Sequence, residues 1–124
     1  MEQKYFICKH CGNVVTKLVD GNTPVWCCGE KMEELVPGTS DGAGEKHIPV
    51  YEVANNLVKV KVGEVAHPMV EVHYIQWIAI HTNLGTQIKY LQPSDAPEAS
   101  FALLEQESVQ AVYAYCNIHG LWKK

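Results

Sequence analysis

Four cysteines crowd into the first 28 residues of this 124-residue chain, and they constrain how that part can fold. They form two pairs, Cys8-x-x-Cys11 and Cys27-Cys28, each followed directly by a glycine. The apolar pieces between them, such as Val14-Val15, are too short to build a core. Four thiolates suit tetrahedral zinc or iron, so we predict that residues 1–36 form a unit held together by a metal ion.

The spacing of the second pair bears on the kind of site. Zinc ribbons usually space both pairs as Cys-x-x-Cys, whereas Cys27 and Cys28 are adjacent. This departure resembles desulforedoxin, a small relative of rubredoxin that holds iron with one spaced and one adjacent pair. The resemblance covers about residues 4–35 and implies an iron centre with Cys8, Cys11, Cys27 and Cys28 as ligands. A zinc-ribbon interaction module stays as an alternative.

The rest of the chain has the pattern of a β-domain. Residues 37–44, rich in glycine and other turn formers, predict a linker. Within residues 45–124, the segment 57–62 alternates with period two and places three valines on one face. Residues 70–81 predict a longer strand, and residues 87–91 and 109–116 predict two more, while residues 101–104 could be strand or short helix. We expect an antiparallel sandwich or a small barrel.

Charge and hydropathy exclude two classes of partner. The net charge is −4, and ten basic residues, all lysine, form no basic stripe for nucleic acid. No apolar run approaches the ~20 residues of a membrane helix, and the first residues show no signal-peptide core. We therefore expect a cytoplasmic protein, in which cysteines more often bind metals than form disulfides.

Histidines and the fifth cysteine supply a second group of candidate ligands. His47 follows the linker, and His67 and His73 lie on either side of Pro68-Met69. Pro68 bends the chain and lets these two histidines converge. Cys116 and His119 lie three residues apart on a glycine-containing turn near the end of the sequence, so both can reach one metal ion.

Three motifs resemble the superoxide reductase family over nearly the whole chain. They are Glu45-Lys46-His47-x-Pro49-Val50, His67-Pro68-Met69-x3-His73-x-Ile75-x-Trp77-Ile78 and Tyr115-Cys116-Asn117-x-His119-Gly120-x-Trp122-Lys123. With the first unit, they match the two-iron members, the desulfoferrodoxins. The resemblance implies an immunoglobulin-like β-sandwich and a second iron, with His47, His67, His73 and His119 as equatorial ligands and Cys116 as the axial ligand.

The resemblance also implies a reaction. One electron and two protons convert superoxide to hydrogen peroxide without making oxygen, and an external donor, in the family often rubredoxin, restores the iron. Lys46 would attract the superoxide anion and help bring a proton through water. Glu45 would occupy the sixth position of the oxidised iron and leave on reduction. The family further suggests a homodimer.

A copper electron carrier of the cupredoxin type is the second alternative. Blue-copper sites use two histidines, one cysteine and a weak axial ligand. The surplus of histidines and the lack of a methionine after Cys116 disfavour it. His10, Met69 and His81 are spare donor groups, and we expect none of them to bind a metal.

Overall fold

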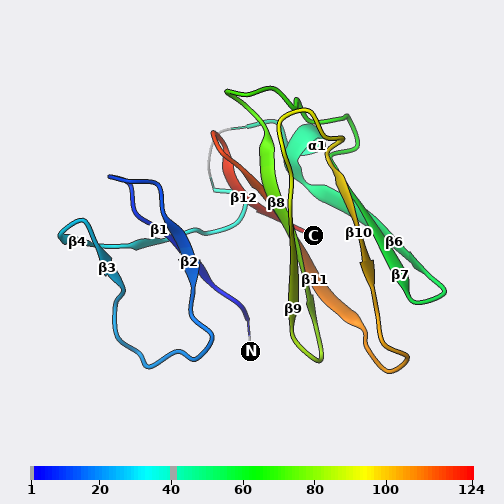
Figure 1. Ribbon diagram of the computed structural model, residues 1–124, viewed down its shortest axis with the longest axis horizontal. Coiled ribbons are helices and arrows are strands. Elements are labelled where there is room, and N and C mark those ends of the chain that lie inside the picture. The colour runs from blue at the N-terminus through cyan, green and yellow to red at the C-terminus, as the bar shows by residue number, and fades with distance from the viewer. Residues whose placement is uncertain (1, 40–41) are drawn as a thin grey trace. The chain divides into compact units, whose positions relative to one another are not determined.

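The computed structural model describes residues 2–39 and 42–124, and it is mainly β, as predicted (Figure 1). The chain divides into two compact units, Met1–Val36 and Pro37–Lys124. Among the described residues there is one helix, α1 (Gly44–His47), which begins at the last residue of the predicted linker. Linker residues 40 and 41 lie outside the described residues. No helix in the described part is long and apolar enough to cross a membrane.

The first unit consists of short strands. A three-stranded antiparallel sheet has the order β2 (Val14–Thr16), β1 (Tyr5–Ile7), β5 (Glu33–Glu34), and β3 (Trp26–Cys27) forms a hairpin with β4 (Glu30–Lys31). Of its described hydrophobic residues, three are buried: Tyr5, Cys8 and Met32. So few buried apolar side chains cannot offset the chain entropy lost on folding.

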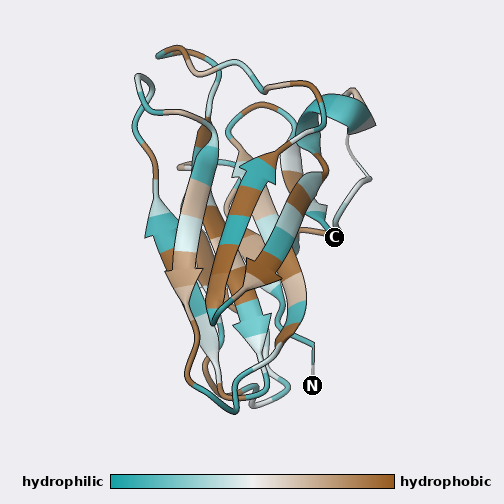
Figure 2. Cartoon of the chain, turned by 90° about the vertical axis from the view of Figure 1, so that its right-hand side faces the viewer, coloured by the Kyte–Doolittle hydropathy of each residue, from teal (hydrophilic) through white to brown (hydrophobic). Residues whose placement is uncertain are grey.

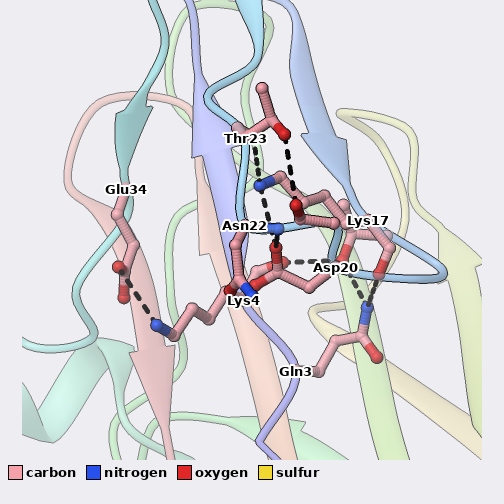
Figure 3. A network of polar contacts seen from close by, with 9 residues as sticks. Gln3, Lys4, Lys17, Asp20, Asn22, Thr23 and Glu34 are labelled. Atoms are coloured by element: carbon pink, nitrogen blue, oxygen red, sulfur yellow. Dashed lines mark hydrogen bonds and ion pairs between the residues drawn. The ribbon is translucent and has the colours of Figure 1, made fainter.

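Polar contacts close the long loop between β2 and β3 (Figure 3). Lys17 Nζ donates to Asp20 Oδ1 at 3.1 Å and to the Thr23 carbonyl at 2.6 Å, and the Asn22 amide donates to the same Asp20 oxygen at 2.8 Å. These donors, the Asn22 amide first, lower the pKa of Asp20. Lys17 also lies 5.4 Å from the centre of the Phe6 ring. Polar contacts thus hold a loop that lacks an apolar anchor.

The second unit is an antiparallel sandwich of two sheets. One sheet has the order β10 (Glu98–Ala102), β7 (Leu57–Val62), β6 (Pro49–Ala54). The other has the order β12 (Gly120–Lys123), β11 (Val109–Cys116), β8 (Ile75–Thr82), β9 (Thr86–Tyr90). Every neighbouring pair is antiparallel. The predicted fold class is therefore confirmed.

The core of the sandwich follows from the alternation along β7. Val58, Val60 and Val62 are at most 1% exposed, as predicted, while the residues between them are exposed. They pack in one cluster with Ile78 and Ile80 of β8 and with further residues of both sheets. Figure 2 shows hydrophobic and hydrophilic residues alternating along strands that face the viewer, which is the pattern of β7. Burial of this shared face stabilises the two sheets against each other.

Side chains of β9 connect it to the edge of the other sheet. Gln87 Nε2 donates to the Ala102 carbonyl at 3.0 Å, and Lys89 Nζ donates to the Ser100 carbonyl. Lys89 also lies 5.3 Å from the centre of the Phe101 ring. Edge carbonyls of β10 are therefore satisfied by side chains, which protects this edge from pairing with other strands.

The strand predicted over residues 70–81 is shorter than expected. β8 begins at Ile75, and the preceding residues form a loop with an isolated bridge between Val70 and His73. The reason lies in the partner strand, because the β11 ladder reaches its last residue, Cys116, opposite Ile75. His73 thus lies outside the strand, which is a correction. Residues 101 and 102, which could have been helical, belong to strand β10.

Candidate metal centres

The second cysteine pair of the first unit lies at the tip of a tight hairpin. Cys28 and Gly29 are the two loop residues between β3 and β4, and both have positive φ, 52° and 76°. Two positive φ values in a two-residue loop indicate a type I′ turn. Gly12, after the first pair, has a φ of 83°. The glycines therefore permit the turns that bring the two pairs together, as the sequence indicated.

The four sulfurs of this unit have the spacing of a tetrahedral metal site. The potential ligand atoms of Cys8, Cys11, Cys27 and Cys28 lie within 4.8 Å of one another. The Cys27 sulfur is 3.6 Å from that of Cys11 and 3.9 Å from that of Cys28. Metal–sulfur bonds of ~2.3 Å in a tetrahedron give sulfur–sulfur distances of about 3.8 Å. The cluster therefore fits one zinc or iron ion.

Hydrogen bonds prepare some of these thiols for metal binding. Backbone amides, that of Cys11 first, lower the pKa of Cys8 to about 6, so this thiol ionises readily. Hydrogen bonds with the side chains of Cys11 and Cys8 raise the pKa of Cys28 to about 12, because four sulfurs crowd together without a cation and retain protons. Asn13 Nδ2 lies 3.7 Å from the Cys27 sulfur and is a donor that the sequence analysis did not identify. A bound cation would relieve the crowding.

The second group of candidate ligands converges at one end of the sandwich. His47 ends α1, His67 and His73 lie in the loop before β8, and Cys116 ends β11. Their potential ligand atoms lie within 4.8 Å of one another. His119 joins them, since its Nδ1 is 3.1 Å from His47 Nε2 and 4.0 Å from the Cys116 sulfur. The structure therefore brings together all five residues that the resemblance named.

Backbone hydrogen bonds fix which nitrogen two of these histidines present. His47 Nδ1 donates to the Ala43 carbonyl at 2.7 Å, and His67 Nδ1 donates to the Pro68 carbonyl at 2.6 Å. Both Nε2 atoms then carry lone pairs, and they face each other at 3.1 Å. Two unprotonated nitrogens this close repel each other unless they share a cation. Metal-bound histidines commonly donate their other ring N–H to a backbone carbonyl in this way.

The electrostatics of the site favour neutral imidazoles. Burial lowers the pKa of His47 and His73, and it lowers the pKa of His67 to about 4. The Nε2 atom of His73 is buried and has no hydrogen-bond partner among the described residues. Burial also raises the pKa of Cys116, whose sulfur accepts a hydrogen bond from the His119 amide at 3.4 Å. Neutral imidazoles and one sulfur are the donor set that suits iron, copper or zinc.

Glu45 and Lys46 precede His47 on α1, and both are exposed. The Lys46 charge contributes to the lowered pKa of His73, after burial and the His119 ring. Glu45 accepts a hydrogen bond from the Val65 amide at 2.9 Å through its backbone carbonyl. Among the described residues its carboxylate belongs to neither group of potential ligand atoms.

The spare donor groups lie outside both clusters. His10 pairs with Glu30 at 3.1 Å on an exposed surface. The Met69 sulfur accepts a hydrogen bond from the Ile75 amide at 3.4 Å, and the His81 ring packs 4.4 Å from that of Tyr113. Each of these side chains contacts other protein groups.

Sequence analysis missed two residues that position the ligands. Asn117 connects the turn after β11 to the loop that carries His73. Gly63, after β7, lies against the backbone of Lys46. Asn117 could have been found by its place inside the Cys-x-x-His motif, and Gly63 by its place directly after a predicted strand. Neither pattern shows which distant segment the residue contacts.

Known proteins resemble this chain either over nearly its whole length or mainly over its second part. The family model described as desulfoferrodoxin matches residues 39–124. The desulfoferrodoxin of Nitratidesulfovibrio vulgaris is 47% identical to this chain, with 98% of this chain and 95% of the relative covered. The superoxide reductase of Pyrococcus horikoshii is 36% identical and covers 68% of this chain, with 89% of its own length aligned.

Solved structures agree with these sequences. The superoxide reductase of Treponema pallidum superposes with a TM-score of 0.84 at 41% identity, covering 100% of this chain and 99% of that one. The one-iron superoxide reductase of Giardia intestinalis superposes with a TM-score of 0.55 at 32% identity, covering 64% of this chain and 95% of its own. The chain therefore belongs to the desulfoferrodoxin family.

Proposed function

We propose that this protein is a superoxide reductase that converts superoxide to hydrogen peroxide at the site formed by four histidines and Cys116. The observation that carries the proposal is the convergence of these five donors beside an exposed cation, Lys46. Relatives and solved structures with the name superoxide reductase support it. We further propose that iron is the metal of both clusters, which gives two iron ions per chain.

The ligand roles follow from the donor atoms. His47, His67, His73, His119 and Cys116 would hold the second iron, and the four other cysteines would hold the first. A ferrous ion held by these five ligands would supply the single electron of the reaction. The Cys116 thiolate would donate electron density to that ion and so favour departure of the product.

Lys46 lies beside the site and is positively charged, so it can attract the substrate. Superoxide is an anion, and an exposed ammonium group beside an open site raises its capture rate. The same residue would orient water for the protons that the product requires. Lys46 acts electrostatically on the site already, since its charge contributes to the lowered pKa of His73 and of His47.

Glu45 would act after the substrate has left. Its exposed carboxylate lies two residues before His47 on the same short helix. A carboxylate prefers the higher charge of the oxidised ion, so Glu45 would bind there in the resting state and leave on reduction. Movement of the side chain or of α1 would bring it in, because in this structure the carboxylate lies outside the ligand cluster.

The balanced reaction requires a partner. Superoxide, one electron and two protons give hydrogen peroxide, so each turnover needs one electron from outside. We propose a rubredoxin-like protein as this donor and a homodimer as the assembled form, both on the family resemblance. We also propose a cytoplasmic location, where cysteines stay reduced and can bind metals as the two ligand clusters require.

The two alternatives explain fewer observations. A blue-copper site needs two histidines and one cysteine, whereas three histidines and Cys116 already lie within one cluster and His119 contacts it. A zinc-ribbon module would explain the first cluster and leave the second without a role. Metal analysis separates the three possibilities, because the proposal requires about two iron ions per chain.

Pulse radiolysis of the reduced, iron-loaded protein tests the function. We expect one superoxide consumed per iron of the second site, with hydrogen peroxide formed and no oxygen released. Cys116→Ser should lose this reaction and the thiolate-to-iron absorption band, while the absorption of the first centre stays. Oxygen released at half the superoxide consumed would indicate a dismutase and contradict the proposal.

A further inference from the structure

The β8–β11 pair is extended at the end remote from the candidate iron site by Asn83, which follows β8. Asn83 Nδ2 donates to the Gln106 carbonyl at 3.1 Å, and Asn83 Oδ1 accepts from the Ser108 amide at 2.8 Å. The Asn83 amide donates to the Ser108 carbonyl at 3.2 Å. The Asn83 side chain thus bonds to the loop before β11 and takes the place that a strand backbone would have in the ladder.

The same three bonds recur at the other end of the pair, where Asn117 follows β11. Asn117 Nδ2 donates to the Val72 carbonyl at 3.1 Å, and Asn117 Oδ1 accepts from the Tyr74 amide at 2.9 Å. The Asn117 amide donates to the Tyr74 carbonyl at 3.2 Å. We call each arrangement an asparagine clasp. The two clasps differ in what they enclose.

The residue enclosed by the Asn117 clasp is His73, between Val72 and Tyr74. The imidazoles of His47 and His67 are anchored through Nδ1 to backbone carbonyls. The buried Nε2 atom of His73 has no hydrogen-bond partner among the described residues, and its ring has no such bond to a described backbone carbonyl. The backbone on both sides of His73 must therefore determine where the ring lies, and the Asn117 side chain holds that backbone.

We propose that Asn117 is the positioning residue for His73 and sets its distance from Cys116. Asn117 follows Cys116 directly, so the clasp connects two ligand-bearing segments that lie more than 40 residues apart in sequence. The inference rests on the metal site proposed above. Loss of the clasp frees the loop of His73, and the second site then binds its metal less tightly and with altered geometry.

The experiment compares Asn117→Ala with Asn83→Ala, its matched control. Each variant removes two side-chain hydrogen bonds of the same kind from one end of the same strand pair. The iron-loaded full chain is equilibrated with a ferrous chelator, and the iron left at each centre is followed by its own absorption after oxidation. We expect Asn117→Ala to lower the affinity of the second site roughly 10- to 100-fold, and Asn83→Ala to leave it unchanged.

Two further readouts distinguish positioning from general stability. Thermal unfolding of the metal-free proteins should show similar losses for the two variants, since equivalent bonds are removed. The thiolate-to-iron absorption band of the second centre should shift in Asn117→Ala alone. Equal iron affinities and identical bands in the two variants would overturn the proposal, whatever their thermal stabilities.

Asn117→Asp serves if the alanine variant fails to fold. It keeps an oxygen that can accept from the Tyr74 amide, and it places a second oxygen against the Val72 carbonyl in place of a donor. We expect its iron affinity to lie between that of the parent and that of Asn117→Ala. Parental affinity would refute the role of the clasp. This test measures iron binding and not activity. A parent protein that binds iron without reducing superoxide would therefore refute the proposed function and leave this test valid.

Discussion

Gly63 lies against the backbone of Lys46, with no room for a side chain between them. A Cβ on Gly63 would lie 2.7 Å from Lys46 Cα and 2.5 Å from the Val65 carbonyl oxygen, and the φ of Gly63 is +84°. The Gly63 amide also donates to the Ile48 carbonyl at 3.1 Å. The turn after β7 therefore fixes the position of α1, which carries Glu45, Lys46 and His47.

Replacement of Gly63 should displace α1. Gly63→Ala adds ~1–2 kcal/mol of backbone strain at positive φ, and its methyl group cannot fit unless the helix moves. We expect slower capture of superoxide in pulse radiolysis together with lower thermal stability. Gly38→Ala is the control, because Gly38 has a φ of +71° and open space around it. Equal capture rates in the two variants would show that Gly63 does not position Lys46.

Lys46 and Glu45 should differ in the step they affect. Removal of the cation in Lys46→Ala should slow bimolecular capture roughly tenfold, or ~1.4 kcal/mol of barrier. It should also flatten the salt dependence of capture, since salt at about 0.15 M largely screens exposed charges beyond roughly 8 Å. Glu45→Ala should leave capture unchanged and alter the spectrum of the oxidised site. Pulse radiolysis at two ionic strengths measures this.

The matched control for the Lys46 test is Lys59→Ala. Lys59 is an exposed residue of β7, so its loss changes the net charge equally without touching α1. Capture rates that fall equally in the Lys46 and Lys59 variants would show that the effect comes from the net charge of the protein and not from the position of Lys46. An unchanged rate in Lys46→Ala at low salt would remove the steering role.

The first unit should unfold when its metal is removed. Tyr5, Cys8 and Met32 are its buried hydrophobic residues in the described part, and the sulfur cluster connects its strands. Cys11→Ser should therefore raise amide exchange throughout residues 5–36, while the sandwich keeps its protected amides. Cys116→Ser, the reciprocal control, should leave the first unit protected. Parental exchange in Cys11→Ser would contradict a metal-held unit.

The metal-free sandwich should lose stability as the pH falls. The folded state lowers the pKa of His67 from 6.5 to about 4, and burial lowers those of His47 and His73. Between these values the unfolded chain binds more protons, so the contribution of these histidines to the free energy of unfolding is complete above pH ~6.5 and decreases toward pH ~4. Denaturant titrations of the metal-free protein between pH ~5 and ~7.5 measure this decrease in the free energy of unfolding.

A histidine variant isolates the part of this slope that belongs to the site. His67→Asn removes one of the titrating groups and should flatten the decline relative to the parent. Loaded iron should instead extend the decline to lower pH, because iron competes with protons for the imidazoles of the folded state while those of the unfolded chain still bind protons. A metal-free parent that becomes more stable as the pH falls through 6 would contradict the lowered pKa values.

The sequence alone determined the parts that depend on local pattern. Alternation over residues 57–62 predicted which valines of β7 face the core, and the structure buries Val58, Val60 and Val62. The two cysteine pairs with their glycines predicted a small unit with a tetrahedral sulfur cluster. These inferences succeeded because side-chain direction in a strand and turn geometry at glycine depend on neighbours in sequence.

Only the tertiary structure decided how the histidine site is built. His73 lies outside β8 because the partner strand β11 ends at Cys116, and no pattern within residues 70–81 contains that information. His47 turns its Nε2 toward the other ligands because its Nδ1 bonds to the Ala43 carbonyl. His119, on its turn, presents Nδ1 to them instead. The Asn117 clasp and the Gly63 contact likewise join segments distant in sequence. Such contacts arise from packing of the whole sandwich, so they become visible only once the chain has folded.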